Sequence, residues 1–454
     1  MSVAVSSSEK PVWRQILTRA VIVAALGYFV DIYDLILFGI VRVPSLEGIG
    51  VEEADFLDVG TLLINSQMVG MLLGGVLWGV LGDKRGRLSV LFGSITLYSI
   101  ANIANAFVST VEWYAVWRFI AGVGLAGELG AGITLVSETL PKHLRGYGTS
   151  LVAAIGILGA VAAFAVGEYH WPMFAAWMAP WQIAYLVGGL MGLALLVLRI
   201  AMVESGVFDK VKLQRDVARG QLRMLVNDRE RFAKYVYTIL VGVPVWFVIG
   251  LLVLFSREIA VELEATGPVD PAVAIVWTYV GASLGGLGWG IFSQLMGSRR
   301  WAVIWALAGI GLAMYVYLFW SGIPPTALYV VCFVLGLGTG YWAIFVTMAA
   351  EQFGTNLRAT VATTAPNFVR GSLVPVLIIF GILAQPRGSV FGLEVPGLGL
   401  GIVRGAMLVG AGTLLLALFS VHRLSETYGK DLDYVERSAG VADLAAGPVP
   451  APAK

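Results

Sequence analysis

Charged side chains are scarce in this sequence. Only 13% of its 454 residues are Asp, Glu, Lys or Arg, whereas 58% are hydrophobic. A chain of this length with so few charges cannot be a set of water-soluble domains, because it lacks the polar residues that would cover their surfaces. We therefore expect most of the chain to lie in a lipid bilayer.

Cysteine and histidine are almost absent. The single cysteine, Cys332, lies within an apolar run, which excludes a disulfide framework. The three histidines, His143, His170 and His422, are too far apart for a zinc-site spacing, and no nucleophile with a paired base is visible. We expect no enzyme activity, no cofactor and no nucleic-acid partner. A transporter-like receptor is a weaker alternative, because the C-terminal tail is short.

What the sequence does contain is an internal repeat. The run LGGVLWG begins at Leu73, and LGGLGWG begins at Leu284. A second pair of segments, ETLPKHLRG from Glu138 and EQFGTNLRA from Glu351, is separated by almost the same distance along the chain. Two matches at one offset indicate that the two halves are copies of one unit.

Long apolar segments occur in two sets of six. A membrane-spanning helix needs about 20 apolar residues, and the sequence of each half supplies six such segments. The expected spans are 19–42, 59–81, 88–108, 113–137, 148–168, 180–200, 235–255, 272–295, 301–320, 326–349, 360–384 and 399–421. This pattern predicts an all-α membrane protein with twelve transmembrane helices in two pseudo-symmetric six-helix bundles.

Basic residues gather on alternate loops between these segments, whereas acidic residues follow the first and seventh. Basic loops face the cytoplasm, so we expect a multi-pass protein of the cell (plasma or inner) membrane with both termini inside. The expected domains are an N-terminal bundle (1–203), a cytoplasmic linker (204–234), a C-terminal bundle (235–425) and a partly disordered tail (426–454).

Three motifs carry a resemblance to a known family. GVLGDKRGRL at 79–88 resembles the signature loop of the major facilitator superfamily. The segment 118–146 resembles the fourth helix of sugar porters, phosphate porters and metabolite:proton symporters, and 27–39 is similar to the first helix of the last two groups. The sugar porter signature is reduced at 202–206, which counts against a sugar. The resemblance implies a transporter that works by alternating access.

The resemblance also implies a gate at the cytoplasmic face. The signature aspartate of the first half is replaced by Gln294 in the second half. We expect salt bridges within three pairs to close this gate in the outward-facing state: Asp83 with Arg87, Glu138 with Arg145, and Glu351 with Arg358.

Few ionisable residues lie within the expected spans, where each is costly. Asp31 and Asp34 are three residues apart, so we expect both carboxylates on one helix face, where their repulsion favours retention of a proton. This pair, or Glu128, is the candidate proton-coupling site. The alternatives are an ion pair of the aspartates with Arg118 that only joins two helices, and a backbone hydrogen bond for Glu128.

Arg370 is the mid-span cation of the second half, and its guanidinium suits a carboxylate or phosphate. The alternative is that it balances the charge of the acids in the first half. We expect Pro366 to break the helix beside it, and Arg42, Arg257 and Arg404 to reach the interface from the outer span ends. The other candidate substrate-binding residues, each of which can equally be a packing residue, are Arg118, Tyr33, Asn367, Gln67 and Trp246.

The sequence therefore predicts a secondary active transporter for a small organic anion, a carboxylate, coupled to protons as a symporter. An inorganic phosphate:proton symporter is the first alternative, and a sugar or polyol porter is the second. The expected partners are the substrate, protons and the lipid bilayer, and we expect the chain to act as a monomer.

Overall fold

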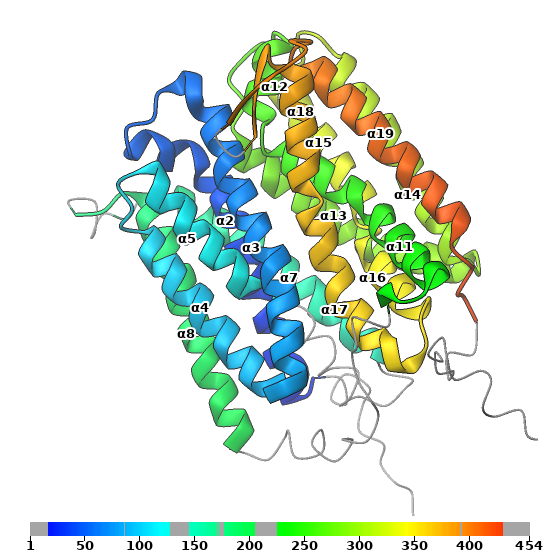
Figure 1. Ribbon diagram of the computed structural model, residues 1–454. Coiled ribbons are helices and arrows are strands. Elements are labelled where there is room, and N and C mark those ends of the chain that lie inside the picture. The colour runs from blue at the N-terminus through cyan, green and yellow to red at the C-terminus, as the bar shows by residue number, and fades with distance from the viewer. Residues whose placement is uncertain are drawn as a thin grey trace, which may run out of the picture.

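The computed structural model describes residues 17–85, 87–127, 145–169, 171, 177–204, 225–390 and 393–429. Within these ranges the chain is almost entirely helical, and the helices form two groups that lie side by side (Figure 1). Among the described residues, nine helices are long and apolar enough to cross a membrane. Each of the twelve expected spans falls on helix, although only part of the fourth is described.

The described part of the N-terminal group contains six helices, which are drawn from blue to green in Figure 1. A short 3-10 helix, η1 (Glu53–Asp55), joins the first two. The six helices are α2 (Arg19–Gly48), α3 (Phe56–Arg85), α4 (Arg87–Asn105), α5 (Val111–Leu125), α7 (Arg145–Glu168) and α8 (Pro180–Glu204).

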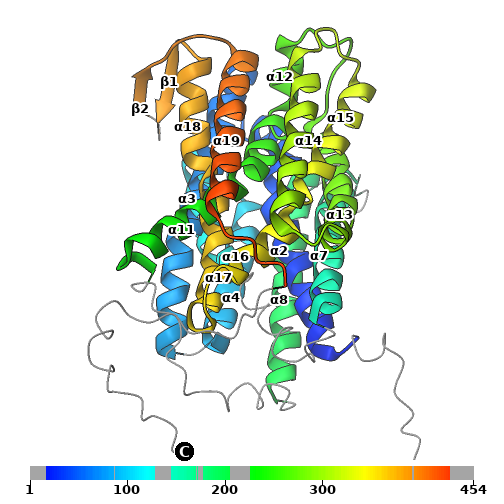
Figure 2. The same ribbon diagram turned by 90° about the vertical axis from the view of Figure 1, so that its right-hand side faces the viewer.

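The C-terminal group follows the same course, with several of its spans built from two consecutive pieces (Figure 2). A small antiparallel hairpin, β1 (Arg387–Val390) with β2 (Leu393–Pro396), follows α18. The helices are α11 (Arg229–Phe247), the π-helix η2 (Val248–Val253), α12 (Ser256–Glu262), α13 (Pro271–Leu295), α14 (Arg299–Phe319), α15 (Pro325–Thr339), α16 (Trp342–Glu351), α17 (Thr355–Gly371), α18 (Leu373–Ala384) and α19 (Ile402–Arg423).

The sequence repeat corresponds to a contact between two helices that occurs in both halves. The indole N–H of Trp78 donates to the carbonyl of Val123 at 2.6 Å, and that of Trp289 donates to the carbonyl of Leu337 at 2.7 Å. In both halves glycines allow the two helices to approach backbone to backbone, so that a Cβ at Gly74 or Gly285 would clash with the same carbonyl that accepts the indole. The duplication predicted from the sequence is therefore confirmed.

Equivalent helices also cross between the halves. In the first half α3 packs against α17 and α18, and in the second half α13, the counterpart of α3, packs against α7 and α2. The contact of α3 with α17 and α18 and that of α13 with α7 are equivalent, because each joins the second span of one half to the fifth span of the other. These contacts form part of the interface between the halves.

One local expectation was wrong. The helix does not break at Pro366, because α17 continues through it to Gly371 and the interruption falls at Ser372, between α17 and α18. A proline removes one backbone hydrogen bond, which a long membrane helix can tolerate.

The first helix of the second half extends beyond the expected apolar span. It begins at Arg229, where the side chain of Asp228 caps it by accepting from the Arg231 amide at 2.8 Å.

We name the two ends of the molecule by their charges. The acidic end carries the turn after α2, η1 and α12, with Glu47, Glu52, Glu53 and Asp55 among its residues. The basic end carries the start of α11, the turn between α13 and α14 with Arg299 and Arg300, and the end of α19.

At the basic end the side chain of Glu426 connects the segment after α19 to the start of α14 by hydrogen bonds. Its carboxylate accepts hydrogen bonds from the Ser298 hydroxyl and from the backbone amides of Arg299 at 3.0 Å and Arg300 at 3.2 Å. Partial burial alone would raise the pKa of Glu426, but these hydrogen bonds, with one from the Tyr428 amide, outweigh it and lower the pKa to about 2.

The hydrogen bonds of Glu426 make the free energy of unfolding depend on pH. Because the pKa is lower in the folded chain, the stabilisation is present above the ordinary glutamate range and is lost as pH falls toward the folded pKa of about 2. We expect Glu426→Gln to lower the free energy of unfolding at pH 7 by about 1–2 kcal/mol. Thermal unfolding in detergent should show this difference at pH 7 and a smaller one at pH 3. A difference that is independent of pH, or one matched by Glu47→Gln at an exposed site, would contradict the assignment.

Candidate functional site

A cavity lies between the two halves near the middle of the spans. The space between its side chains, including the open solvent at its mouth, is about 850 Å³. The N-terminal half contributes residues of α2 and α7, and the C-terminal half contributes the rest. The lining residues are Tyr28, Ile32, Leu35, Ile157, Val245, Trp246, Ile249, Tyr279, Ala282, Ser283, Gly286, Leu287, Thr339, Gly340, Trp342, Ala343 and Arg370.

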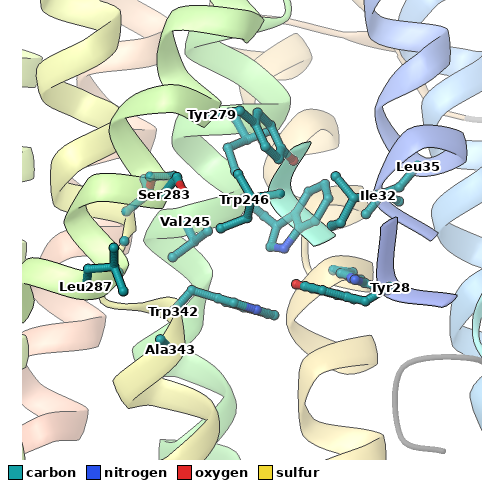
Figure 3. A pocket seen from close by; sticks show the side chains of 17 residues that line it. Tyr28, Ile32, Leu35, Val245, Trp246, Tyr279, Ser283, Leu287, Trp342 and Ala343 are labelled. Atoms are coloured by element: carbon teal, nitrogen blue, oxygen red, sulfur yellow. The ribbon is translucent and has the colours of Figure 1, made fainter. Parts of the chain in front are cut away.

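Aromatic rings dominate the wall of this cavity. Tyr28 comes from the N-terminal half, and Trp246, Tyr279 and Trp342 come from the C-terminal half. In Figure 3 the hydroxyl of Tyr28 points toward the indole of Trp342, and Trp246 lies between that pair and Tyr279. Ile249 belongs to the π-helix η2, a distortion that often occurs at functional sites. Flat rings on several sides favour a flat, largely apolar ligand.

Arg370 is the only charged side chain among the described residues that line the cavity. It is 1% exposed, and its Nη2 donates to the Asp31 carboxylate at 3.2 Å, so that an ion pair joins α17 to α2. The Nε and Nη1 atoms of Arg370 are buried and have no hydrogen-bond partner among the described residues. A buried guanidinium with unused donors at a cavity wall can bind a carboxylate.

The two aspartates of α2 lie close enough for their charges to interact, as expected, but their contacts differ. Asp31 meets Arg370 of the other half, whereas Asp34 is buried inside the N-terminal half, where its Oδ1 is so close to Gly188 of α8 that an added Cβ would lie 2.5 Å away. The Asp34 carboxylate lies beside the side chain of Asn102 in α4 and interacts with the charge of Arg118 in α5. A separation of three residues turns side chains by about 60° around a helix, and here that rotation decides which half each acid faces.

Several predicted substrate residues lie within the N-terminal half and outside this cavity. Arg118 is fully buried, donates to the Gln67 side chain and lies 4.7 Å from the centre of the Phe38 ring. The hydroxyl of Tyr33 donates to the carbonyl of Ala184 at 2.8 Å. These contacts join helices of one bundle. Trp246 does line the cavity, as expected.

Asn367, unlike Arg118, Gln67 and Tyr33, contacts the opposite half. Its side-chain amide donates to the carbonyl of Ala126 at 3.0 Å and so connects α17 to the end of α5 in the other half. Glu128 and Glu138 lie outside the described residues, as do the side chains of Asp83, Arg87 and Arg145.

Of the expected gate pairs, only Glu351 and Arg358 belong to the described part with their side chains. The carboxylate of Glu351 accepts from the Thr427 hydroxyl at 2.7 Å and lies 3.7 Å from Nε of Arg299. Both contacts stay within the C-terminal half, and they connect Glu351 to the segment that Glu426 fastens.

A second ion pair between the halves closes the acidic end. Arg42 was expected to reach the interface, but its side chain is fully buried and binds both oxygens of Glu258, at 2.7 and 3.0 Å. It also donates to the carbonyls of Phe56 and Leu254 at 3.2 and 3.3 Å. Arg42 follows the lining residue Leu35 by two turns of α2, about 10 Å, so the pair lies on the acidic side of the cavity.

Two exposed contacts between the halves surround this pair. Arg257 binds Glu53 at 2.5 Å, and the Gln385 amide donates to Asp58 at 2.9 Å. We call the contacts of Arg42, Glu258, Arg257, Glu53 and the Gln385–Asp58 pair the acidic-end seal. Sequence reasoning did not find it, although Arg42 and Arg257 at the outer ends of the first and seventh spans, with the acids that follow each span, were its visible signal.

The sequence also missed Tyr279, Ser283 and Thr339 of the cavity wall. Their residue types occur throughout apolar helices, and only the packing of α13 and α15 turns them toward the space between the halves.

Comparison with known proteins agrees with this architecture. The family model of the Major Facilitator Superfamily matches residues 16–373. The niacin transporter of Acinetobacter baylyi is 32% identical over 183 residues, 40% of this chain and 40% of that protein. The gentisate transporter of Corynebacterium glutamicum is 25% identical over 432 residues, 90% of this chain and 89% of that protein.

A solved structure shares the fold. The inward open structure of the xylose transporter from E. coli superposes with a TM-score of 0.64 and covers 91% of this chain and 97% of that one, at 17% identity. At this identity the likeness shows the fold alone, twelve transmembrane helices in two bundles. The chain therefore belongs to the Major Facilitator Superfamily, and it is an integral multi-pass membrane transporter and not an enzyme.

Proposed function

We propose that this transporter moves an aromatic monocarboxylate together with a proton. The observation that carries the proposal is the buried Arg370 in a cavity whose other walls are apolar and aromatic. The guanidinium would hold the carboxylate, and Trp246, Trp342, Tyr28 and Tyr279 would enclose the ring. Niacin and gentisate, named for two similar proteins, are both aromatic rings that carry a carboxylate.

The alternative substrates fit the cavity less well. Phosphate at neutral pH carries up to two charges and is strongly hydrated, whereas the described lining offers one cation and mostly carbon. A sugar needs several side chains that both donate and accept hydrogen bonds, and the polar groups here are few, chiefly the hydroxyls of Ser283, Thr339, Tyr28 and Tyr279.

Proton coupling is part of the proposal because acids accompany the site. Asp31 touches Arg370 directly, and Asp34 lies one turn away. A carboxylate substrate that enters a cavity of low polarity adds a negative charge, and a proton that enters with it removes the imbalance.

The proposed transport cycle alternates between the two ends. The acidic-end seal is closed here, and the basic loops support an orientation in which the acidic end faces outward and both termini face the cytoplasm. In this account the halves, 1–203 and 235–425, rock about the cavity, and the seal opens while the cytoplasmic pairs, among them Asp83–Arg87 and Glu138–Arg145, close.

Removal of the guanidinium tests the binding site. We expect Arg370→Ala to weaken the binding of benzoate to the purified transporter by at least tenfold, because it removes a charge-assisted hydrogen bond of about 1.5–3 kcal/mol. Calorimetric titration in detergent measures the affinity. Arg257→Ala, which removes a partly exposed cation of the seal, is the matched control and should bind benzoate as the wild type does.

The ligand series decides between the substrate classes. Benzoate should bind, whereas benzamide, inorganic phosphate and xylose should not compete with it. Competition by phosphate or xylose, or unchanged benzoate affinity in Arg370→Ala, would contradict the proposal that the substrate is an aromatic carboxylate.

Opening of the seal tests alternating access. Loss of one partner from a buried ion pair costs about 3–5 kcal/mol, so Glu258→Gln should shift the equilibrium toward a state open at the acidic end. A cysteine introduced at Leu35, in the cavity wall, should then react several-fold faster with an impermeant maleimide applied from that side.

Glu53→Gln is the matched control for this experiment, because Glu53 is 75% exposed in its pair with Arg257 and should contribute little. The exchanged pair Arg42→Glu with Glu258→Arg should restore slow labelling. If Glu258→Gln folds and leaves the labelling rate unchanged, the seal has no gating role.

A further inference from the structure

Two aromatic side chains mark the limit of the cavity on its basic side. Helix α2 runs from the basic to the acidic end, and Tyr28 is its first residue in the cavity wall. Helices α15 and α16 run the opposite way, and Trp342 and Ala343 are their last residues in the wall. Because a helix rises about 1.5 Å per residue, Tyr28 lies about 10 Å from Leu35 along α2, on the side away from the acidic-end seal.

The two rings meet across the halves. The hydroxyl of Tyr28 points toward the indole of Trp342 (Figure 3) and lies within hydrogen-bonding reach of it. The indole N–H can only donate, so the hydroxyl oxygen is the acceptor. Both rings are partly exposed, whereas Leu35 and Tyr279, nearer the acidic end, are 4% and 5% exposed. The two rings therefore separate the exposed part of the cavity wall from the buried part.

Tyr28 is held in place by its own half, whereas Trp342 is not. An added Cβ at Gly156 of α7 would overlap the Tyr28 ring, so the ring lies directly against the α7 backbone in space that glycine leaves free. Trp342 is the first residue of α16, a helix of ten residues that follows the interruption after α15. Its ring packs against that of Phe345 on the same helix, with 5.0 Å between the centroids. We therefore expect Trp342, together with α16, to move when the two rings separate.

The barriers on the two sides of the cavity differ in strength. On the acidic side the buried pair of Arg42 with Glu258 joins the halves, and its separation would leave buried charges without partners. At the basic end the described pair of Glu351 with Arg299 stays within one half. The contact of the two rings is neutral, and water at the mouth of the cavity can replace its hydrogen bond. Its separation therefore costs much less than that of the seal.

We propose that Tyr28 and Trp342 form a gate between the substrate site and the basic end, and that this gate opens while the acidic-end seal stays closed. The inference rests on the proposed function for the identity of the ligand, and it gives the two rings a role in release besides the enclosure of the ligand. With the rings together the site is closed on both sides. When Trp342 moves away with the start of α16, the ligand leaves toward the cytoplasm before the halves rock.

A cysteine in the cavity wall reports which side is open. Ser283 lines the cavity and differs from cysteine by one atom, and the native Cys332 is fully buried, so Ser283→Cys supplies the reactive thiol. An impermeant maleimide is applied to membrane vesicles from the basic or the acidic side, with no substrate present. We expect Trp342→Ala to raise the labelling rate from the basic side by at least about tenfold. Labelling from the acidic side should stay slow, because the seal is intact.

Two conservative variants keep an aromatic ring and remove only the hydrogen bond, so the test does not depend on whether Trp342→Ala folds. Tyr28→Phe and Trp342→Phe should each raise the labelling rate from the basic side by about two- to tenfold, the effect of one neutral hydrogen bond. The double variant should differ from the faster single variant by less than about twofold, because both changes remove the same bond. Trp305→Ala, which truncates an exposed ring of α14 outside the cavity, is the matched control and should label as the wild type does.

Two results would overturn the gate. One is a labelling rate from the basic side that none of the three single variants changes. The other is an equal rise from both sides, which would show that the variants disturb the packing of the whole bundle. The proposed function is tested separately, because the labelling uses no substrate. If the wild type binds no benzoate, the identity of the ligand is wrong whatever the labelling shows, and if benzoate binds but the rates do not change, only the gate is wrong.

Discussion

The constraint on which the rest of this structure depends is the buried cation Arg370, which lies between two bundles of apolar helices. A guanidinium at mid-membrane depth is expensive unless it has a counter-ion, and Arg370 finds one in Asp31 of the opposite half. The pair holds the halves together at the cavity, and it explains why a transporter with so few charges keeps two of them at its centre. Anything that binds Arg370 must replace this contact or add to it.

The two ion pairs between the halves differ in their surroundings. Arg42 and Glu258 are enclosed by backbone carbonyls at the acidic end, so that the pair is a fixed contact of this conformation. Arg370 retains buried donors without partners and lies against open space. The first arrangement suits a contact that opens and closes as a unit, and the second suits a cation that binds a ligand from the cavity.

Much of the fold could be predicted from the sequence, because the repeat that begins at Leu73 and Leu284 reports packing that both halves need. The partners of individual charged residues were harder to predict from the sequence. The sequence left open whether Arg370 balances an acid or binds an anion, and the structure shows a bond to Asp31, from which Arg370 is 339 residues away, a distance over which no periodicity gives information. Arg42 was misjudged for the same reason, since its partner Glu258 lies in the other half. Trp246 could be found as a large ring near mid-span, whereas Arg118, Gln67 and Tyr33 are equally polar but turn into their own bundle.

The broken symmetry between the halves thus has a physical meaning. Packing residues such as Trp78 and Trp289 remain duplicated because both copies must form the same bundle, whereas the acid of α2 and the cation of α17 remain single because each completes the other. The most direct test of this account is a structure of the transporter with bound 4-iodobenzoate. The account predicts iodine between the rings of Trp246, Trp342 and Tyr28 and the carboxylate on Arg370. Iodine outside this cavity, or a carboxylate that makes no contact with Arg370, would contradict it.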